Sequence, residues 1–436
     1  MTITTGAVDT VVIGAGHAGL AVSRLLTDAG RDHVVLDRGR VGERWRSERW
    51  DSLHLLTPSW MTRLPGWGYT GPEPDGYLSA GAFVGLLEAY AASFHAPVVE
   101  RTTVLSVAAT GQDVRRFRVE TTAGTWHARH LVLATGPHGT PIVPAALTGP
   151  RRAEGVEVVT SNDYRNPARL APGGVLVVGA SASGVQIADE LNRAGREVTL
   201  AVGRHTRIPR RYRGVDIFWW LEATGRLART IDEVPDPEAA RRETSLQLVG
   251  RGDGTRAVPD LDLGTLQDQG VRLAGRLEAV SGHHATFRDD LSATVAAADT
   301  ATYKLLDSID RFVDRAGLAD QVWGGRWPRP VTVRPTPERL DLRAAGIATV
   351  LVAAGYRPDP LPWLHLPVTD GEGRFVQRRG VTPVEGVYVV GQRFQHRRDS
   401  GYIDGARHDA EAVVSHLLAA SDDRRGIRTM SQETAL

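Results

Sequence analysis

Three glycines and one aspartate near the start of the chain stand at a spacing that can hold a ligand. Gly14, Gly16 and Gly19 follow an apolar stretch, and Asp37 ends a second apolar stretch about 20 residues further on. Gly14 would make a tight turn, Gly16 would let the backbone approach a pyrophosphate, and Gly19 would let a helix pack on a strand. The N–H groups that begin this helix would hold the pyrophosphate, and Asp37 would accept hydrogen bonds from ribose hydroxyls. The pattern predicts a dinucleotide site.

The same arrangement recurs in the middle of the chain. Gly179, Ser181, Ser183 and Gly184 follow another apolar stretch, with Ser181 where the second glycine of the motif belongs. A serine hydroxyl can donate a hydrogen bond to a phosphate oxygen. The strand after the predicted helix ends at Arg204 in place of an acid, which favours the 2′-phosphate of NADPH over NADH. Three more arginines follow closely: Arg207, Arg210 and Arg211. The alternative is that Arg204 is a solvated strand end.

A later apolar strand that ends on glycine completes each unit. Residues 131–136 close the first unit with Ala134, Thr135 and Gly136, and residues 348–355 close the second with Gly355. A plan repeated within one chain predicts two nucleotide-binding units of α/β type. The Asp37 end of the first unit suits a free 2′-hydroxyl, as in FAD or NAD.

Further candidates for cofactor contact and catalysis lie in residues 38–58 and in the region before the last predicted helix. Residues 38–58 are rich in Trp and Arg and predict a long ordered loop. The loop either contacts the cofactor or is a surface loop held in place by the packing of its aromatic rings. The cofactor contacts expected in this loop are Arg38, Arg44, Trp45 and Thr57. The catalytic candidates are Arg44, His54 and Arg397, although a lone histidine is more often structural and Arg397 lies in a charge run.

Other kinds of active site find no support in the sequence. The spacing shows no Ser-His-Asp arrangement and no pair of carboxylates, and His283-His284 has no carboxylate at ligand spacing, so we expect no metal. Because the chain has no cysteine, it cannot form a disulfide or a redox-active thiol pair.

The bulk properties indicate a globular protein that acts on small molecules. The 436 residues suffice for two or three domains, and a net charge of +1 gives no reason to expect nucleic acid or a membrane as partner. No apolar run approaches the ~20 residues of a membrane span, and residues 1–10 lack a signal peptide's pattern. We therefore expect a cytoplasmic protein whose partners are a small-molecule substrate and O2, and we leave a homodimer open.

Periodicity and turn residues predict the elements that position these sites. We expect a helix over residues 78–94 with Ser79 as N-cap, and an antiparallel meander over residues 98–130. Residues 131–136 would form a separate strand. Further expectations are an insertion at residues 206–261 over a substrate site, strands over 271–298, a helix over 300–314, and a disordered tail from residue 421.

The order of these motifs, together with Ala354-Gly355-Tyr356, resembles the class B flavoprotein monooxygenases, which include the flavin-containing and Baeyer–Villiger monooxygenases. The resemblance extends from Val8 to about Leu418 and is strongest to a bacterial branch of FAD-dependent oxidoreductases. It implies two Rossmann-like domains of glutathione-reductase type with antiparallel meanders. Residues 1–165 and 356–436 would form the FAD-binding domain, and residues 166–355 would form the NADPH-binding domain.

The resemblance also implies the reaction. NADPH would reduce the flavin, and O2 would add to it as a flavin peroxide that oxygenates a small organic substrate. Gly391 and the residues up to Asp404 would lie along the flavin ring, with the start of the last helix facing it. Ala153 and Thr160 stand where the family has Phe and His, and this difference favours an alternative, an NAD(P)H oxidase or reductase that inserts no oxygen. A flavoprotein that senses nucleotides without turnover is the third reading.

Overall fold

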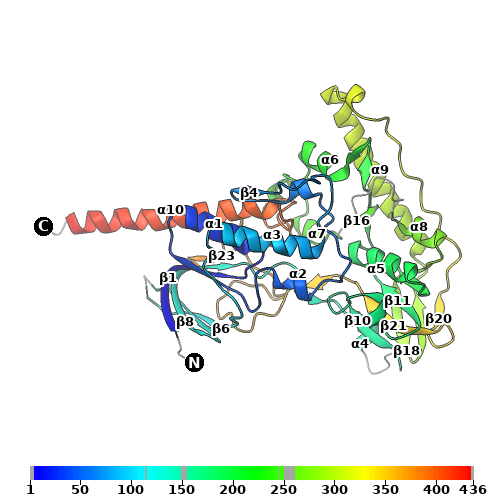
Figure 1. The fold of residues 1–436 in the computed structure, drawn as a ribbon, viewed down its shortest axis with the longest axis horizontal. Helices are drawn as coiled ribbons and strands as arrows, with labels where there is room; N and C mark the ends of the chain where they lie inside the picture. The colour runs from blue at the N-terminus through cyan, green and yellow to red at the C-terminus, as the bar shows by residue number, and fades with distance from the viewer. Residues whose placement is uncertain (1–3, 113–114, 149–154, 245, 250–260, 434–436) are drawn as a thin grey trace.

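Two β-sheets, one mixed and one parallel, lie side by side with their helices in the molecule (Figure 1). The computed structural model describes residues 4–112, 115–148, 155–244, 246–249 and 261–433. The α/β architecture, with a parallel core in both sheets and an antiparallel meander on the first, confirms the predicted fold class.

The first sheet has the order β5-β2-β1-β8-β7-β6. Strand β7 pairs with the first part of β8, and β23 pairs with the last part. The central strand of this sheet, β1, runs parallel to β2 on one side and to β8 on the other. Our prediction of two separate strands across residues 125–136 is wrong, because residues 124–133 form one strand that pairs with β1 and, over its first part, with β7. The strands are β1 (Thr4–Ile13), β2 (His33–Leu36), β5 (Val98–Val99), β6 (Val104–Ala109), β7 (Phe117–Thr121), β8 (Gly124–Leu133) and β23 (Val387–Val389).

Three long helices pack around the first core: α1 (His17–Asp28), α3 (Ala80–Ser93) and α10 (Gly405–Glu433). The predicted N-cap of α3 is confirmed, since the Ser79 hydroxyl accepts the Ala82 N–H at 3.1 Å. The predicted disorder from residue 421 is wrong for the described residues, because α10 continues to Glu433 (Figure 1). The loop predicted over residues 38–58 also contains a short helix, α2 (Glu43–Ser47).

The second sheet has the order β10-β21-β11-β12-β17, with all strands parallel. Its strands are β10 (Glu157–Thr160), β11 (Gly174–Val178), β12 (Val198–Ala201), β17 (Arg272–Ala274) and β21 (Ile347–Val352), and helix α5 (Ala182–Arg193) packs on it. Strand β10 precedes the boundary that we predicted at residues 165/166, yet it pairs with β21. The chain therefore joins the second sheet earlier than this boundary allows.

The two connections between the sheets lie together. Strand β9 (Thr140–Pro141) carries the chain out of the first sheet, and β22 (Tyr356–Arg357) carries it back. The two pair antiparallel, with Tyr356 opposite Pro141. The outgoing and returning linkers thus form a two-stranded ribbon between the halves.

Two insertions in the second half pack on each other. The predicted insertion holds β13 (Thr206–Pro209), β14 (Arg211–Tyr212), β15 (Val215–Asp216), α6 (Ile217–Ala223), α7 (Pro237–Arg241) and β16 (Leu246–Val249). The second insertion interrupts a small antiparallel sheet, β18 (Leu277–Ser281), β19 (His284–Phe287) and β20 (Arg339–Asp341). It contains the long helix α9 (Leu291–Ala316), which buries Leu306 and Ile309 with Trp220 of α6 in one core.

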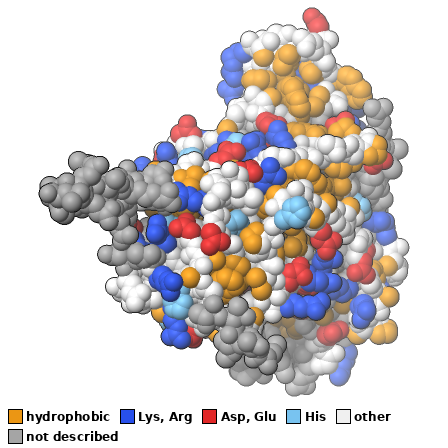
Figure 2. Space-filling model, turned by 60° about the vertical axis from the view of Figure 1, so that its left-hand side comes forward, with side chains coloured by type: hydrophobic (Ala, Val, Ile, Leu, Met, Phe, Trp, Pro, Cys, Tyr) orange, Lys and Arg blue, Asp and Glu red, His pale blue; other side chains and the backbone are white. Residues whose placement is uncertain are grey.

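Helix α9 corrects two predictions. Residues 291–298 are helical and not strands, and the helix is longer than the predicted 300–314. Its buried Leu291, Val295, Ala298 and Thr302 repeat at helical spacing, a period that the short polar residues between them obscured. Hydrophobic side chains gather at the upper end of the molecule, where α6 and the end of α9 lie (Figure 2).

The other short elements are β3 (Arg63–Leu64), β4 (Trp67–Gly68), α4 (Ala145–Thr148) and α8 (Leu263–Asp268). Among the helices of the described residues, none is both long enough and apolar enough to span a bilayer.

Candidate functional site

The two glycine loops have nearly the same backbone geometry. Gly14 has φ +116° and Gly179 has φ +109°. A Cβ on Gly14 would overlap the carbonyl oxygen of Ala134, and a Cβ on Gly179 would overlap that of Ala353. Each first glycine therefore makes the turn from the first strand of its unit into the helix, directly against the end of the strand that closes the unit.

The third glycines are equivalent as well. A Cβ on Gly19 would overlap the carbonyl oxygen of Gly14, and one on Gly184 would overlap that of Gly179. The helix in each unit thus lies directly on its loop, as the spacing predicts.

Both helices begin without a side-chain cap. Gly16 is the N-cap of α1, and a Cβ there would meet nothing within 4 Å. Ser181 is the N-cap of α5, and its side chain makes no capping hydrogen bond. Ser183, in the first turn of α5, is half-buried. An uncapped helix N-terminus beside open space suits an anionic ligand such as a pyrophosphate.

Asp37 is held at the first loop. One carboxylate oxygen accepts the Ala15 N–H at 2.7 Å, and the other accepts the Gly39 N–H at 2.8 Å. These bonds fix the carboxylate against the glycine loop. An ionised carboxylate has about four acceptor positions, so it can also accept ribose hydroxyls.

Arg204 at the end of β12 is exposed, and its guanidinium donates to the Arg242 carbonyl at 3.0 Å. A second arginine lies at the same strand end, because a Cβ on Gly203 would be 3.8 Å from Nε of Arg276. Sequence reasoning missed Arg276. The available signal was that it follows β17, the next strand in the sheet.

Two of the arginines that we grouped with Arg204 have other roles. Arg207 is buried and bonds to Asp262 and Asp299, both at 2.5 Å. Arg210 is buried too, donates to the Leu56 carbonyl at 2.7 Å and lies over a tyrosine ring. Both hold the insertion in place and cannot bind a phosphate as they stand; Arg211 remains exposed.

Two histidines, His17 and His138, lie close to each other beside the first glycine loop. Loss of hydration, followed by the charges of the nearby Arg49 and Arg44, lowers the pKa of the His138 imidazole to about 3. Burial also lowers the pKa of the half-exposed His17, the first residue of α1, to about 4. The His138 ring packs edge-on against Tyr356 of the returning linker, with ring centres 5.1 Å apart.

The predicted residues of the 38–58 segment take up different positions. Arg44 donates to Glu48 at 2.7 Å and to the Gly139 carbonyl at 3.3 Å, and it lies about 4 Å from where a Cβ on Gly136 would be. Trp45 packs edge-on against Phe83, with ring centres 4.9 Å apart, so it joins the core. The remaining three are the exposed Arg38, the half-buried Thr57, and His54, whose Nδ1 lies 3.0 Å from the Ser52 carbonyl oxygen.

The segment before α10 is close to α1 and rich in internal ion pairs. A Cβ on Gly391 would lie 2.8 Å from the Cβ of Ala18, so this turn touches α1. The carboxylate of Asp404 accepts two hydrogen bonds of 2.7 Å from Arg63. Arg397 forms a two-bond pair with buried Asp399 at 3.1 and 3.0 Å. The structure thus gives Asp404 and Arg397 internal partners, and their roles at the cofactor stay predictions.

The predicted insertion contacts both the end of β12 and the segment before α10. Glu243 accepts hydrogen bonds from Arg398, and its backbone carbonyl accepts one from Arg393. The preceding residue, Arg242, offers its carbonyl to Arg204. Residues 242–243 therefore join the end of β12 to the segment before α10.

The position where the family has a histidine is occupied by Thr160, whose hydroxyl donates to Asp163 at 2.6 Å. Tyr164 is fully buried and donates to Glu190 of α5 at 2.8 Å. Ala153 lies outside the described residues.

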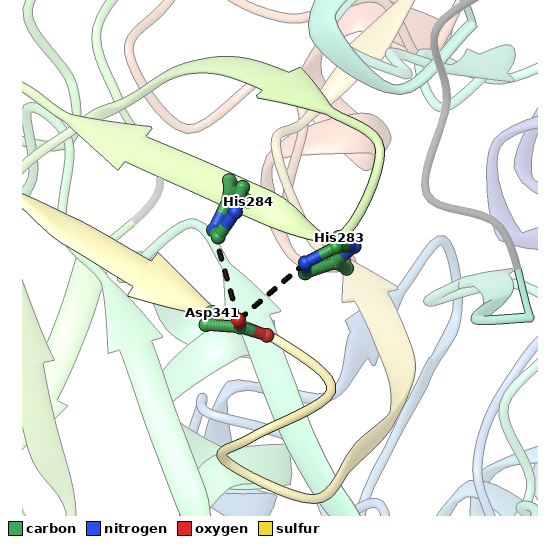
Figure 3. A group of neighbouring side chains, drawn as sticks. All are labelled: His283, His284 and Asp341. Atoms are coloured by element: carbon green, nitrogen blue, oxygen red, sulfur yellow. Dashed lines mark ion pairs between the residues drawn. The ribbon is translucent and has the colours of Figure 1, made fainter.

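Our expectation that His283-His284 lacks a carboxylate partner is wrong. Strand β20 brings Asp341 to the pair, and the two rings and the carboxylate face one another (Figure 3). Asp341 is far from both histidines in the sequence, so spacing could not show this group.

Known proteins share this architecture. Residues 11–215 match the family model of the pyridine nucleotide-disulphide oxidoreductases. The chain is 29% identical to a CzcO-like oxidoreductase of Geobacillus kaustophilus over 94% of this chain and 98% of that protein. It is 31% identical to the indole-3-pyruvate monooxygenase YUCCA4 of rice over 48% of this chain and 52% of that protein.

The fold agrees with these matches. A flavin-containing monooxygenase from Stenotrophomonas maltophilia superposes with a TM-score of 0.64 at 20% identity, over 95% of this chain and 99% of that one. Residues 11–215, which carry both glycine loops, thus resemble the pyridine nucleotide-disulphide oxidoreductases, and the chain is similar in sequence to CzcO-like oxidoreductases and to plant indole-3-pyruvate monooxygenases.

Proposed function

We propose that this protein is an FAD-dependent monooxygenase that consumes NADPH and oxygenates a small organic molecule. One observation carries the proposal. The two glycine loops have nearly the same geometry, but the second strand of each unit leads to a different charge: the Asp37 carboxylate in the first unit and the Arg204 guanidinium in the second. Different ends suit different nucleotides, so FAD is assigned to the first loop and NADPH to the second.

The first loop fits FAD. The open space at Gly16 and the uncapped start of α1 form a cradle for the pyrophosphate. Asp37 is already oriented by two backbone N–H groups and would accept the ribose hydroxyls. When bound, the flavin supplies the redox chemistry between NADPH, O2 and the substrate.

The second loop fits NADPH. Ser181 would donate to the pyrophosphate, and Arg204 with Arg276 would flank the 2′-phosphate at the end of β12. An acid at this strand end would repel that phosphate, whereas two guanidinium groups attract it.

The region around His17 and His138 would take the substrate and the reactive ends of both cofactors. His17 and His138 are neutral at pH 7 because burial lowers the pKa of each, so they offer hydrogen bonds without charge. Residues 242–243, held by Arg204 on one side and Arg393 on the other, would help to exclude water from this region. The chain has no cysteine, so it cannot pass electrons through a thiol pair as a disulfide reductase does.

An NAD(P)H oxidase without oxygen insertion is the second candidate. Thr160 favours it, because its hydroxyl is bound to Asp163 and no imidazole stands at this position of the linker.

Stopped-flow reduction of the FAD-loaded protein under argon tests the nucleotide assignment. We expect NADPH to reduce the flavin with at least about tenfold higher kcat/KM than NADH, and Arg204→Ala with Arg276→Ala to remove this preference while FAD content stays constant. Arg211→Ala is the matched control, since Arg211 is an exposed arginine outside the proposed site. An unchanged preference in the double variant would refute the assignment.

Oxygen chemistry is tested on the same preparation with a panel of ketones, amines and thioethers under labelled O2. Incorporation of one labelled oxygen atom into a product supports the monooxygenase. Quantitative H2O2 with every compound supports the oxidase. A protein that takes up no FAD would refute the whole scheme.

A further inference from the structure

The small sheet β18-β19-β20 gathers two imidazoles and a carboxylate at one turn. Gly282 has φ +58° and makes the tight turn from β18 to β19, which places His283 in the turn and His284 at the start of β19. His284 stands opposite Asp341 in the antiparallel pairing of β19 with β20. The backbone therefore fixes the three residues relative to one another.

The spacing of their polar atoms suits a metal ion better than hydrogen bonds. Oδ2 of Asp341 lies 3.5 Å from Nε2 of His283 and 3.9 Å from Nδ1 of His284, both beyond normal hydrogen-bond length. One potential ligand atom from each residue lies within 4.8 Å of the other two. Ligand atoms about 2.0–2.2 Å from a tetrahedral metal are about 3.3–3.6 Å apart, so small side-chain movements would complete the site.

A second observation points to a ligand. Nδ1 of His284 is shielded from solvent and has no hydrogen-bond partner in the described part of the chain. The other oxygen of Asp341, Oδ1, accepts the Ala344 N–H at 3.0 Å, which holds the carboxylate with Oδ2 toward the rings (Figure 3). A shielded nitrogen that faces a fixed carboxylate oxygen is unfavourable unless a cation or proton lies between them.

We propose that His283, His284 and Asp341 bind a divalent cation of borderline softness, with Zn²⁺ as the reference ion. The ligands are Nε2 of His283, Nδ1 of His284 and Oδ2 of Asp341, with water in the remaining position. Two imidazoles and one carboxylate favour Zn²⁺, Ni²⁺, Co²⁺ or Cu²⁺ over Mg²⁺ and Ca²⁺.

The bound metal would stabilise the fold by joining two of its segments. Strand β20 follows the long α9 insertion, and the metal would fasten its end to the turn before β19. The sheet lies on the outer side of the second half, away from β1 and α1 (Figure 1). We therefore expect the ion to stabilise the second half and to take no part in catalysis.

Calorimetric titration of the tag-free, FAD-loaded full-length protein with Zn²⁺, after dialysis against a chelator, tests the proposal. We expect one equivalent to bind, and His284→Gln and Asp341→Asn each to weaken binding by at least about tenfold. His365→Gln, at an exposed histidine elsewhere, is the matched control and leaves binding unchanged. X-ray absorption of the Zn²⁺ form should show two imidazole ligands.

Asparagine at position 341 can still accept the Ala344 N–H, so the turn should fold in this variant; unchanged circular dichroism and FAD content check this. No saturable binding by the wild-type protein overturns the proposal. Binding of equal affinity in the wild type and both variants overturns it as well, because the ion then sits elsewhere.

Discussion

Asp409 on α10 gives the sharpest test of the electrostatics around the segment before this helix. Asp409 is 1% exposed. Burial, with a contribution from Asp399, raises its pKa to about 7, although Ser400 and Arg397 act in the opposite direction. The charged form is therefore unfavourable in the folded protein.

The size of the effect follows from the pKa difference. The pKa is about 3.9 in an unfolded chain and about 7 in the folded one, so the folded state binds more protons between these values. The free energy of unfolding falls as the pH rises through this window, and the loss is complete above about pH 7. About three pKa units at 1.36 kcal/mol each give an upper limit of about 4 kcal/mol. Asp409→Asn removes the ionisation and keeps the shape.

Thermal unfolding of the FAD-loaded protein at pH 4.5 and pH 8 measures this difference. We expect Asp409→Asn to unfold several degrees above the wild type at pH 8 and close to it at pH 4.5. Glu411→Gln removes a carboxylate from an exposed site on the same helix and should change stability by less than about 0.5 kcal/mol at either pH. An equal gain at both pH values, or no gain at pH 8, would show that the pKa of Asp409 is not raised.

Three further substitutions test the packing of the second half. Arg207→Ala leaves Asp262 and Asp299 buried and unpaired, so the free energy of unfolding in urea should fall by about 3–5 kcal/mol. Gly184→Ala puts a Cβ into the Gly179 carbonyl, so NADPH should bind at least about tenfold more weakly, by fluorescence titration, while FAD content is unchanged. Tyr164→Phe removes the hydrogen bond to Glu190 and should lower the melting temperature, with a loss of about 1–2 kcal/mol.

The sequence could predict the repeated units because local signals determine them. The glycine loops, the apolar strands before them and the helix capped by Ser79 depend on residues that are close in the chain. Local signals fail where burial changes within one element: residues 124–133 change from partial to continuous burial, yet they form one strand because β1 pairs along its length. The same holds for α9, whose polar residues hide its period.

The parts of the site that could not be predicted depend on contacts between distant residues. Arg276 reaches the end of β12 only because β17 pairs beside it, and Asp341 reaches the two histidines only through the pairing of β19 with β20. Arg207 shows the opposite error, since nearness to Arg204 in sequence placed it at the phosphate, whereas its partners at positions 262 and 299 hold it in the interior. Sequence spacing indicates which charged side chains lie near a site, but it does not show which of them already form ion pairs with other residues.

The insertion gives this chain a contact through which the two proposed nucleotide sites would influence each other. The Arg242 carbonyl accepts from Arg204, and the next residue, Glu243, binds both Arg393 and Arg398 in the segment before α10. A 2′-phosphate that attracts Arg204 would compete with the Arg242 carbonyl for the same guanidinium. NADPH binding would then loosen residues 242–243 at one end while Glu243 still holds them at the other. Glu243→Gln weakens the second attachment, so we expect faster release of NADP⁺ with unchanged affinity for FAD, measured by stopped-flow fluorescence; an unchanged release rate would show that the two ends act independently.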